Sequence, residues 1–175
     1  IGVGTPGLVD TATGIVRWAV GLDWRDVPVG ARLAELTGLP VIVVNDSQAA
    51  AMGEWAFGRH DASTAMIVLK VGEGIGAGIV IGGRLYPGDD AGAGEIGHTR
   101  VGEGEALCRC GGHGCLETVA SLRAVLVRAV ALVPGHPGSQ LALGPVTRDA
   151  LLAAFRAGDT LARQVVLESA RPLGR

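Results

Sequence analysis

Short apolar segments alternate with glycine-rich and polar turns along most of the chain, and two kinds of spacing recur in them. Residues 41–44 are Val-Ile-Val-Val, a β-branched run typical of a strand buried on both faces. Residues 29–37 and 47–57 instead place apolar side chains at helical spacing, and they stop at Gly38 and near Gly58, where glycine often ends a helix. Strands and helices in alternation predict an α/β domain.

The same reasoning predicts elements along the rest of the chain. The expected strands are residues 1–3, 66–71 and 75–81, a hairpin of residues 8–10 and 14–17, and a return of the chain through residues 82–86; the expected helices are residues 116–132, 147–156 and 159–170. A Gly-Glu-Gly turn at residues 72–74 joins two of these strands.

Composition sets limits on size and class. The chain has 175 residues, 48% of them apolar, which suits one ordinary domain or a part of a larger one. It has 29 glycines and only 3% aromatic residues, which favours loops that bind through their backbone over an aromatic ligand cage.

Charge and hydropathy exclude two classes of function for this segment. The net charge is −2 and no run of Lys or Arg is present, so we do not expect the segment itself to touch DNA. No apolar run reaches the roughly 20 residues of a membrane span, and Ile1 does not begin a signal peptide. We therefore expect no membrane partner and a cytoplasmic location, where thiols stay reduced.

All the cysteines lie within eight residues, as Cys108, Cys110 and Cys115. Together with His98 they form the ligand set of a closed structural zinc site, three thiolates and one imidazole. One disulfide with a leftover cysteine is the alternative, which the odd count disfavours. His113 is a competing imidazole, but it lies inside the short cysteine loop and would reach around the ion with more difficulty.

Asp46 is the candidate general base. It follows the strand at residues 41–44 and precedes a helix, the place where α/β folds hold ligands. A carboxylate there could accept the proton of a substrate hydroxyl. The alternative is that Asn45, Asp46 and Ser47 only cap the next helix, and both roles can coexist.

The glycine turn is a candidate cofactor loop. Gly72, Gly74 and Gly76 could bring backbone N–H groups close to a phosphate. Glu73, however, places a carboxylate where a phosphate would lie, and like charges repel. A plain hairpin is the alternative interpretation.

Two glutamates bracket the cysteine segment. If the segment folds back around zinc, Glu95 and Glu117 could converge with Asp46 on one polyol, each accepting hydrogen bonds from hydroxyl groups. The alternative is that both are solvated surface carboxylates, the common state of glutamate.

These motifs together resemble the ROK family, named for repressors, open reading frames and kinases. The features that carry the resemblance are Gly-Thr-Pro-Gly at residues 4–7, Asn45-Asp46 before an Ala-rich helix, the glycine turn at residues 72–78, and Glu-Ile-Gly-His with Cys-x-Cys-Gly-x-x-Gly-Cys-Leu-Glu at residues 95–117. The resemblance is strongest over residues 1–132. It implies an actin-like, ribonuclease-H-like ATPase fold, present in part, with a sugar pocket between two lobes and a structural zinc that holds the sugar-binding loop.

The resemblance also implies roles for single residues. Asn45, Asp46, Glu95, His98 and Glu117 match the family's sugar contacts, and Asp46 matches the catalytic base of its kinases. His98 would then serve both the metal and the sugar, one ring nitrogen for each. The preference for His98 over His113 rests partly on this match.

Departures from the family pattern favour one of its two functional classes. Family kinases usually have Thr or a similar small polar residue where this chain has Glu73, and many have Asn-Asp-Ala-Asn where this chain has Asn45-Asp46-Ser47-Gln48. The sequence of residues 24–28 also resembles that of the family's transcriptional regulators more than that of its kinases. We therefore expect the sugar-sensing domain of a regulator of carbohydrate use. An ATP- and Mg²⁺-dependent sugar kinase is the alternative, and a purely structural zinc module is a third.

Several parts that the resemblance implies fall outside residues 1–175. The family's phosphate loop is expected upstream and its adenosine-side glycines downstream, so the chain is interpreted as a fragment. A regulator would contact DNA through a winged helix-turn-helix outside this chain. The family suggests a homo-oligomer, a dimer or a tetramer.

Overall fold

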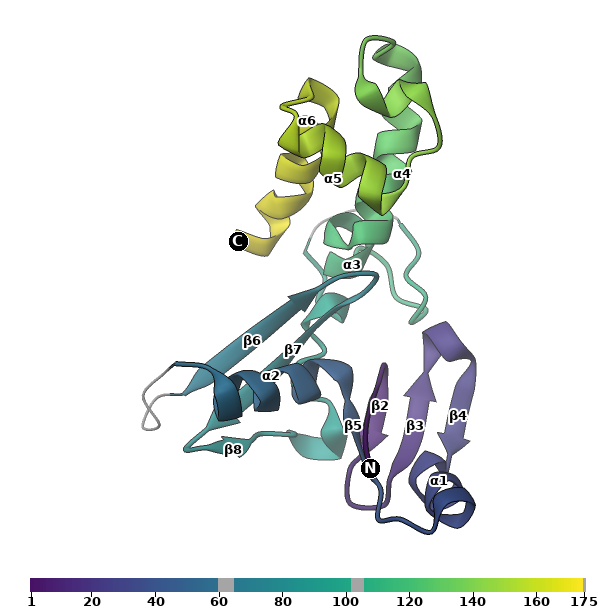
Figure 1. Ribbon diagram of the computed structural model, residues 1–175, viewed down its shortest axis with the longest axis vertical. Coiled ribbons are helices and arrows are strands. Elements are labelled where there is room, and N and C mark those ends of the chain that lie inside the picture. Colours follow the sequence, from purple (N-terminus) through teal and green to yellow (C-terminus); the bar gives the residue numbers. More distant parts are fainter. Residues whose placement is uncertain (60–64, 102–105, 175) are drawn as a thin grey trace. The chain divides into compact units, whose positions relative to one another are not determined.

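The structure is a computed structural model, and it describes residues 1–59, 65–101 and 106–174. The chain forms two compact units (Figure 1). The first unit comprises Ile1–Lys70 and Gly76–Ile96, and the second comprises Val71–Ile75 and Gly97–Arg175. Each unit is described by itself below.

Two small sheets begin the first unit. Strands β1 (Gly2–Thr5) and β5 (Ile42–Asn45) pair in parallel, and β2 (Leu8–Asp10), β3 (Ile15–Ala19) and β4 (Trp24–Val27) form an antiparallel meander. The inward side chains of these strands make one apolar core, formed by Val9, Val16, Ala19 and Val43. The predicted hairpin is thus confirmed, whereas β4 was not predicted, because Trp-Arg-Asp-Val has no clear alternation of apolar and polar residues.

Strand β5 corrects one expectation. Val43 is fully buried, but the neighbouring Ile42 is 64% exposed, so the strand buries one face and not two. Since β5 pairs only with β1 among the described strands, the apolar run at residues 41–44 fills a two-stranded sheet.

Both predicted helices of the first unit are confirmed, with α2 beginning one residue earlier than predicted. Helix α1 (Val29–Thr37) ends at Gly38, which has φ 68° and donates its N–H to the Ala34 carbonyl. That left-handed conformation strains any residue with a Cβ atom, which explains the glycine. Helix α2 (Asp46–Phe57) follows β5 directly.

A third sheet has the order β6 (Met66–Val71), β7 (Ile75–Ile81) and β8 (Arg84–Leu85), with β7 and β8 antiparallel. Helix α2 packs closely on β7 at Gly76 and Gly78. A Cβ atom at Gly76 would lie 2.5 Å from Ser47 Oγ, and one at Gly78 would lie 2.4 Å from Ala51 Cβ. These glycines therefore let the helix and the strand approach each other.

The second unit is mainly helical. Its helices are α3 (Leu116–Ala120), α4 (Leu122–Leu132), α5 (Arg148–Arg156) and α6 (Thr160–Ala170). Residues from α4, α5 and α6 share a core that includes Val125, Ala129, Leu151 and Val165.

Among the described helices of both units the longest is α2 with 12 residues, whereas a membrane span needs roughly 20, and no membrane-spanning helix is found.

The helix predicted at residues 116–132 is divided in two. Ser121 has extended backbone angles (φ −68°, ψ 158°) and its hydroxyl accepts the N–H of Ala124, so it caps α4 and ends α3. Serine competes well for backbone hydrogen bonds at this position, and the apolar spacing alone did not reveal the break. Short 3-10 segments complete the described chain: Val20–Leu22, Asp89–Ala91, Ile96–His98, Val133–Gly135, Gln140–Leu143 and Arg171–Gly174.

Candidate functional site

Asn45 fixes the start of helix α2. Its Oδ1 accepts the N–H groups of Ser47 at 2.8 Å and Gln48 at 3.2 Å, and its Nδ2 donates to the Gly7 carbonyl at 2.9 Å. The first contacts satisfy backbone donors that have no partner inside the helix. The last contact ties the Thr-Pro-Gly turn to the end of β5, so one amide orders both segments.

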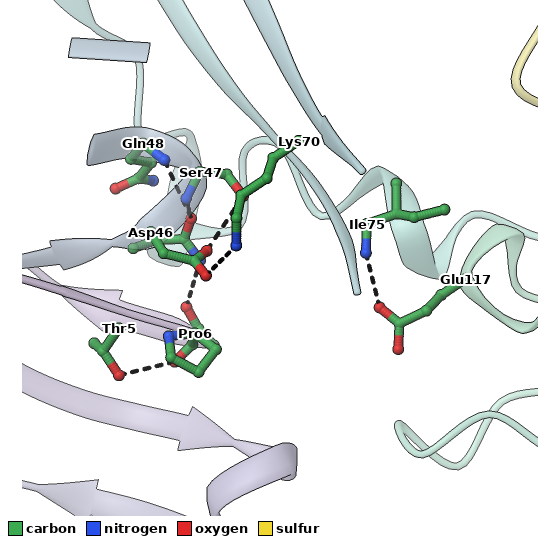
Figure 2. A network of polar contacts seen from close by, with 10 residues as sticks. Thr5, Pro6, Asp46, Ser47, Gln48, Lys70, Ile75 and Glu117 are labelled. Carbon is green, nitrogen blue, oxygen red and sulfur yellow. Dashed lines mark hydrogen bonds and ion pairs between the residues drawn. The ribbon is translucent and has the colours of Figure 1, made fainter. Parts of the chain in front are cut away.

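Asp46 is left for another role by this arrangement. It is the first residue of α2, and its Oδ2 lies 2.5 Å from Lys70 Nζ, while its Oδ1 accepts the Ser47 hydroxyl at 3.3 Å (Figure 2). The helix is capped by Asn45 and not by Asp46. The capping role therefore falls on Asn45, and the role of Asp46 as a general base stays a prediction.

Glu95 follows a close backbone contact in the first unit. The carbonyl of Gly94 accepts the N–H of Ala77 at 2.8 Å, and Gly94 has φ 94°. A Cβ atom at Gly94 would lie 1.9 Å from the Ala77 carbonyl oxygen, so only glycine fits there. Glu95 is thereby placed beside β7, half-buried.

The predicted metal ligands come together in the second unit. The ligand atoms of His98, Cys108, Cys110 and Cys115 all lie within 4.8 Å of one another. Cys110 Sγ lies 3.8 Å from Cys115 Sγ, and Cys108 Sγ lies 3.5 Å from His98 Nδ1. Two sulfurs bound tetrahedrally to one zinc are about 3.8 Å apart, given Zn–S bonds of about 2.3 Å. The cluster can bind a metal ion, and its spacing fits zinc.

The geometry favours one of the alternatives that the sequence left open for these residues. All three cysteines are free, so no disulfide joins them. Among the described residues the cluster contains His98 and not His113. His113 is exposed and forms a bridge with Leu107 across the loop. The nitrogen of His98 that faces the cluster is Nδ1.

The thiols of the cluster differ in acidity. A hydrogen bond from the Gly112 N–H lowers the pKa of Cys110. Burial raises the pKa of Cys108, and burial together with the two neighbouring thiols raises that of Cys115 to about 12. Because thiolates are the metal-binding form, a metal ion bound here would displace protons from the thiols, and its binding would strengthen as the pH rises.

Glu117 connects the metal segment to the glycine turn. Its Oε2 accepts the N–H of Ile75 at 3.1 Å (Figure 2). Gly97, next to His98 in the sequence, packs on the same residue, since a Cβ atom there would lie 2.1 Å from the Ile75 carbonyl oxygen. The carbonyl of Gly72 accepts the N–H of Leu122 at 2.8 Å, which holds the first turn of α4.

Close packing explains two of the three glycines in the turn, Gly74 and Gly76. Gly72, Gly74 and Gly76 do not have positive φ angles, so the conformational freedom of glycine does not explain why glycine occurs at these positions. A Cβ atom at Gly74 would lie 2.7 Å from Glu117 Oε2, and Gly76 faces Ser47. A role in nucleotide binding stays a prediction for these glycines.

Five sites of predicted sugar contact divide between the units. Asn45, Asp46 and Glu95 belong to the first unit, and His98 and Glu117 to the second. Their convergence on one sugar stays a prediction.

The sequence reasoning missed several charged residues near these sites. One is Lys70, whose signal was its rarity, since it is the only lysine of the chain. The others are Arg109, Arg123 and Arg128, which line an open pocket of about 520 Å³ in the second unit with Glu73 and Glu117. Scattered along the sequence, these arginines formed no basic run.

Comparison with known proteins places the chain. The sequence model of the ROK family matches residues 1–175 of this chain. The chain is 43% identical over 180 residues to a glucokinase of Halalkalibacterium halodurans, covering 99% of this chain and 54% of that protein. It is 35% identical to the DNA-binding transcriptional repressor Mlc of Escherichia coli, covering 100% of this chain and 43% of that protein.

Solved structures agree with this assignment. A ROK family glucokinase from Streptomyces griseus, in complex with glucose and AMPPNP, superimposes with a TM-score of 0.91 at 36% identity, over 99% of this chain and 58% of that one. A ROK family regulator homologous to E. coli Mlc gives a TM-score of 0.87 at 34% identity, over 99% and 44%. The chain spans about half the length of these relatives. It has the actin-like α/β fold of these proteins, and it belongs to the ROK family.

Proposed function

We propose that this chain is the sugar-sensing part of a ROK-family transcriptional regulator of carbohydrate use. The observation that carries the proposal is Glu73. Its carboxylate lies in the glycine turn and lines the same pocket as Glu117. A nucleotide phosphate brought to this turn would meet negative charge, which weakens ATP binding without affecting a neutral sugar.

The proposed sugar contacts are Asn45, Asp46, Glu95, His98 and Glu117. Asp46 is oriented at the start of α2 with its carboxylate partly exposed, as a hydroxyl acceptor requires. The proposed metal is a structural zinc held by His98, Cys108, Cys110 and Cys115. With Nδ1 facing the metal, Nε2 of His98 is the nitrogen for the sugar.

Sugar binding can regulate only if the ligand prefers one state of the protein. The DNA-binding part of the proposed regulator would be supplied outside the residues described here, and the proposed regulator would be a homo-oligomer, a dimer or a tetramer. The repressor Mlc, which is 35% identical to this chain, is the relative that supports this interpretation.

An ATP-dependent sugar kinase is the second candidate. It is favoured by the position of Asp46 and by the three arginines of the pocket, Arg109, Arg123 and Arg128, which could offset the charge of Glu73. In that case Asp46 would accept the proton of the sugar hydroxyl as its oxygen attacks the γ-phosphorus of ATP. The glucokinase of H. halodurans supports this candidate.

The deciding experiment compares ATP and sugar as ligands of the full-length protein. Isothermal titration with D-glucose, D-xylose and D-mannose, and separately with Mg·ATP, gives the affinities, and a coupled assay measures ADP release with each sugar. We expect sugar binding with weak ATP binding and negligible turnover. Glu73→Gln, which removes the charge but keeps the shape, should tighten ATP binding by about 3- to 10-fold.

Two outcomes would reverse the proposal. Sugar-dependent ADP release at rates of about 1–100 s⁻¹, typical of kinases, would favour the second candidate. Asp46→Asn should then abolish turnover. ATP binding unaffected by Glu73→Gln would remove the argument from the glycine turn.

A further inference from the structure

The single lysine of the chain faces the proposed acceptor of the sugar. Lys70 lies near the end of β6, and its Nζ is 2.5 Å from Asp46 Oδ2 (Figure 2). The side chains are 46% and 32% exposed, respectively. A ligand can therefore reach the pair from solvent, while α2 and β6 hold the two groups together.

The choice of lysine at this position is unusual for this chain. The other 14 basic residues, apart from histidine, are all arginine. Arginine grips a carboxylate with two parallel N–H groups and would occupy both oxygens of Asp46. The lysine ammonium is compact and has three N–H groups, of which the contact with Asp46 Oδ2 uses one.

A sugar hydroxyl fits between such groups because it both donates and accepts hydrogen bonds. A carboxylate has about four acceptor positions, so Asp46 can keep Lys70 and still accept the hydrogen of a hydroxyl. A second N–H of Lys70 can donate to the oxygen of that hydroxyl. Because the paired charges compensate each other, excluding water from them costs less than excluding it from a lone carboxylate.

We propose that Lys70 and Asp46 bind a single sugar hydroxyl as a donor and acceptor pair, with Lys70 donating to its oxygen and Asp46 accepting its hydrogen. The inference rests on the proposed sugar site at Asp46, and it applies to a regulator and to a kinase alike. It makes Lys70 a specificity-determining residue for one position of the sugar ring.

The test is a cycle that combines a protein change with a ligand change. Among D-glucose, D-xylose and D-mannose, the sugar that binds most tightly to the full-length protein is titrated calorimetrically, together with its monodeoxy analogues. Lys70→Met should raise the Kd of the parent sugar by about 10- to 100-fold, the usual loss for a charged hydrogen bond. One monodeoxy analogue should bind weakly to the wild type and lose little more with Lys70→Met.

Two further variants separate a binding role from a structural one. Lys70→Arg keeps a cation and should recover part of the affinity, while preserving the discrimination against the same analogue. Arg17→Met is the matched control, because Arg17 pairs with Asp10 at 2.9 Å with similar side-chain exposures of 49% and 28%. Its sugar Kd should stay within about twofold of the wild type.

The outcomes distinguish this inference from the proposed function. If the wild type binds a sugar and Lys70→Met leaves the Kd unchanged or lowers it, Lys70 is not a ligand and the inference is wrong, while the sugar site stands. If the wild type binds none of the three sugars, the proposed sugar site and this inference both fail. An equal loss for every deoxy analogue would also contradict a pairing on one hydroxyl.

If Lys70→Met fails to fold, a second experiment tests the inference on the wild-type protein. Acetylation of Lys70 by an amine-reactive reagent is followed by peptide mass spectrometry, with and without saturating sugar. We expect the sugar to slow modification of Lys70 at least about fivefold, since the pair would be covered. Equal rates would overturn the inference.

Discussion

The surroundings of Asp46 and the metal cluster are ordered by different forces. Asp46 lies where β5 runs directly into α2, and hydrogen bonds of Asn45 hold both segments. The metal cluster of His98, Cys108, Cys110 and Cys115 lies in loops, with two isolated bridges and one 3-10 turn as the regular structure among the described residues. The first region is ordered by hydrogen bonds within the protein, whereas the second gathers side chains that could hold a metal ion.

The difference has a consequence for sensitivity to change. Side-chain hydrogen bonds at a helix start contribute about 1 kcal/mol each, so losing one leaves the rest of the Asp46 region in place. Metal ligands act as a set, because removing one lowers the affinity of all the others for the ion. We expect the metal cluster to fail as a unit and the Asp46 region to weaken step by step.

Cys110→Ser should have the largest effect. It should abolish stoichiometric metal binding and lower Tm by roughly 10 °C, corresponding to about 3–5 kcal/mol, a fraction of what zinc supplies to isolated finger peptides. Mass spectrometry of bound metal and hydrogen exchange measure the two effects. Exchange should accelerate in residues 106–116 but not in α2. Metal retained at full stoichiometry would show that Cys110 is not a ligand.

Gly97→Ala should come next. Its Cβ atom would lie 2.1 Å from the Ile75 carbonyl oxygen, so the segment that carries His98 must shift, at a cost of about 1–3 kcal/mol. Gly112→Ala is the matched control inside the cluster, where the new Cβ atom would lie 3.5 Å from Cys110 Sγ. Thermal unfolding should separate the two variants, and an equal Tm for both would contradict the close packing on Ile75.

Asn45→Ala tests the Asp46 region. Loss of the helix cap should lower stability by about 1–2 kcal/mol, without loss of metal. Asn45→Asp keeps the acceptor for Ser47 and Gln48 but removes the donor to the Gly7 carbonyl, so its stability should fall between alanine and wild type. Chemical denaturation measures the order. Equal losses would mean that the contact with Gly7 carries the whole effect.

Arg17→Met should have the smallest effect. Arg17 is exposed and Asp10 is half-buried, and hydrogen bonds from Thr13, more than Arg17, hold the pKa of Asp10 below its ordinary value. Stability linked to Asp10 is present above its unfolded pKa and is lost as the pH falls through the lower folded value. Tm at pH 7 should match that of the wild type within error. A clear drop would show that the β2 to β4 meander depends on this ion pair.

Much of the fold could be predicted from local signals. Helix α1, strands β6 and β7 and the hairpin of β2 and β3 follow from apolar spacing and glycine positions. The division at Ser121 could not be predicted, because the helical spacing of apolar residues continues across the serine. Strand β4 could not be predicted either, because its residues do not alternate between apolar and polar. The pattern of apolar residues also does not show which face of a strand is covered by another element, as the exposed Ile42 in β5 illustrates.

The candidate site divides in the same way. Cysteine spacing and a histidine ten residues before the first cysteine were enough to predict the metal cluster, because its ligands follow one another closely in sequence. Lys70 is 24 residues from Asp46 and could not be paired with it from the sequence. The hydrogen bond between Glu117 and Ile75 spans 42 residues and likewise depends on tertiary structure.

The carbonyl of Gly72 that holds the first turn of α4 also sets a mechanical constraint. Helix α4 cannot slide along its axis without breaking this hydrogen bond at its amino end. A displacement of the glycine turn would therefore move the helix as well. Helix α4 shares its core with α6, so a shift of α4 would also act on the side chains of α6 that pack against it. The glycine turn and the helical core of the second unit are thus mechanically coupled through one backbone hydrogen bond.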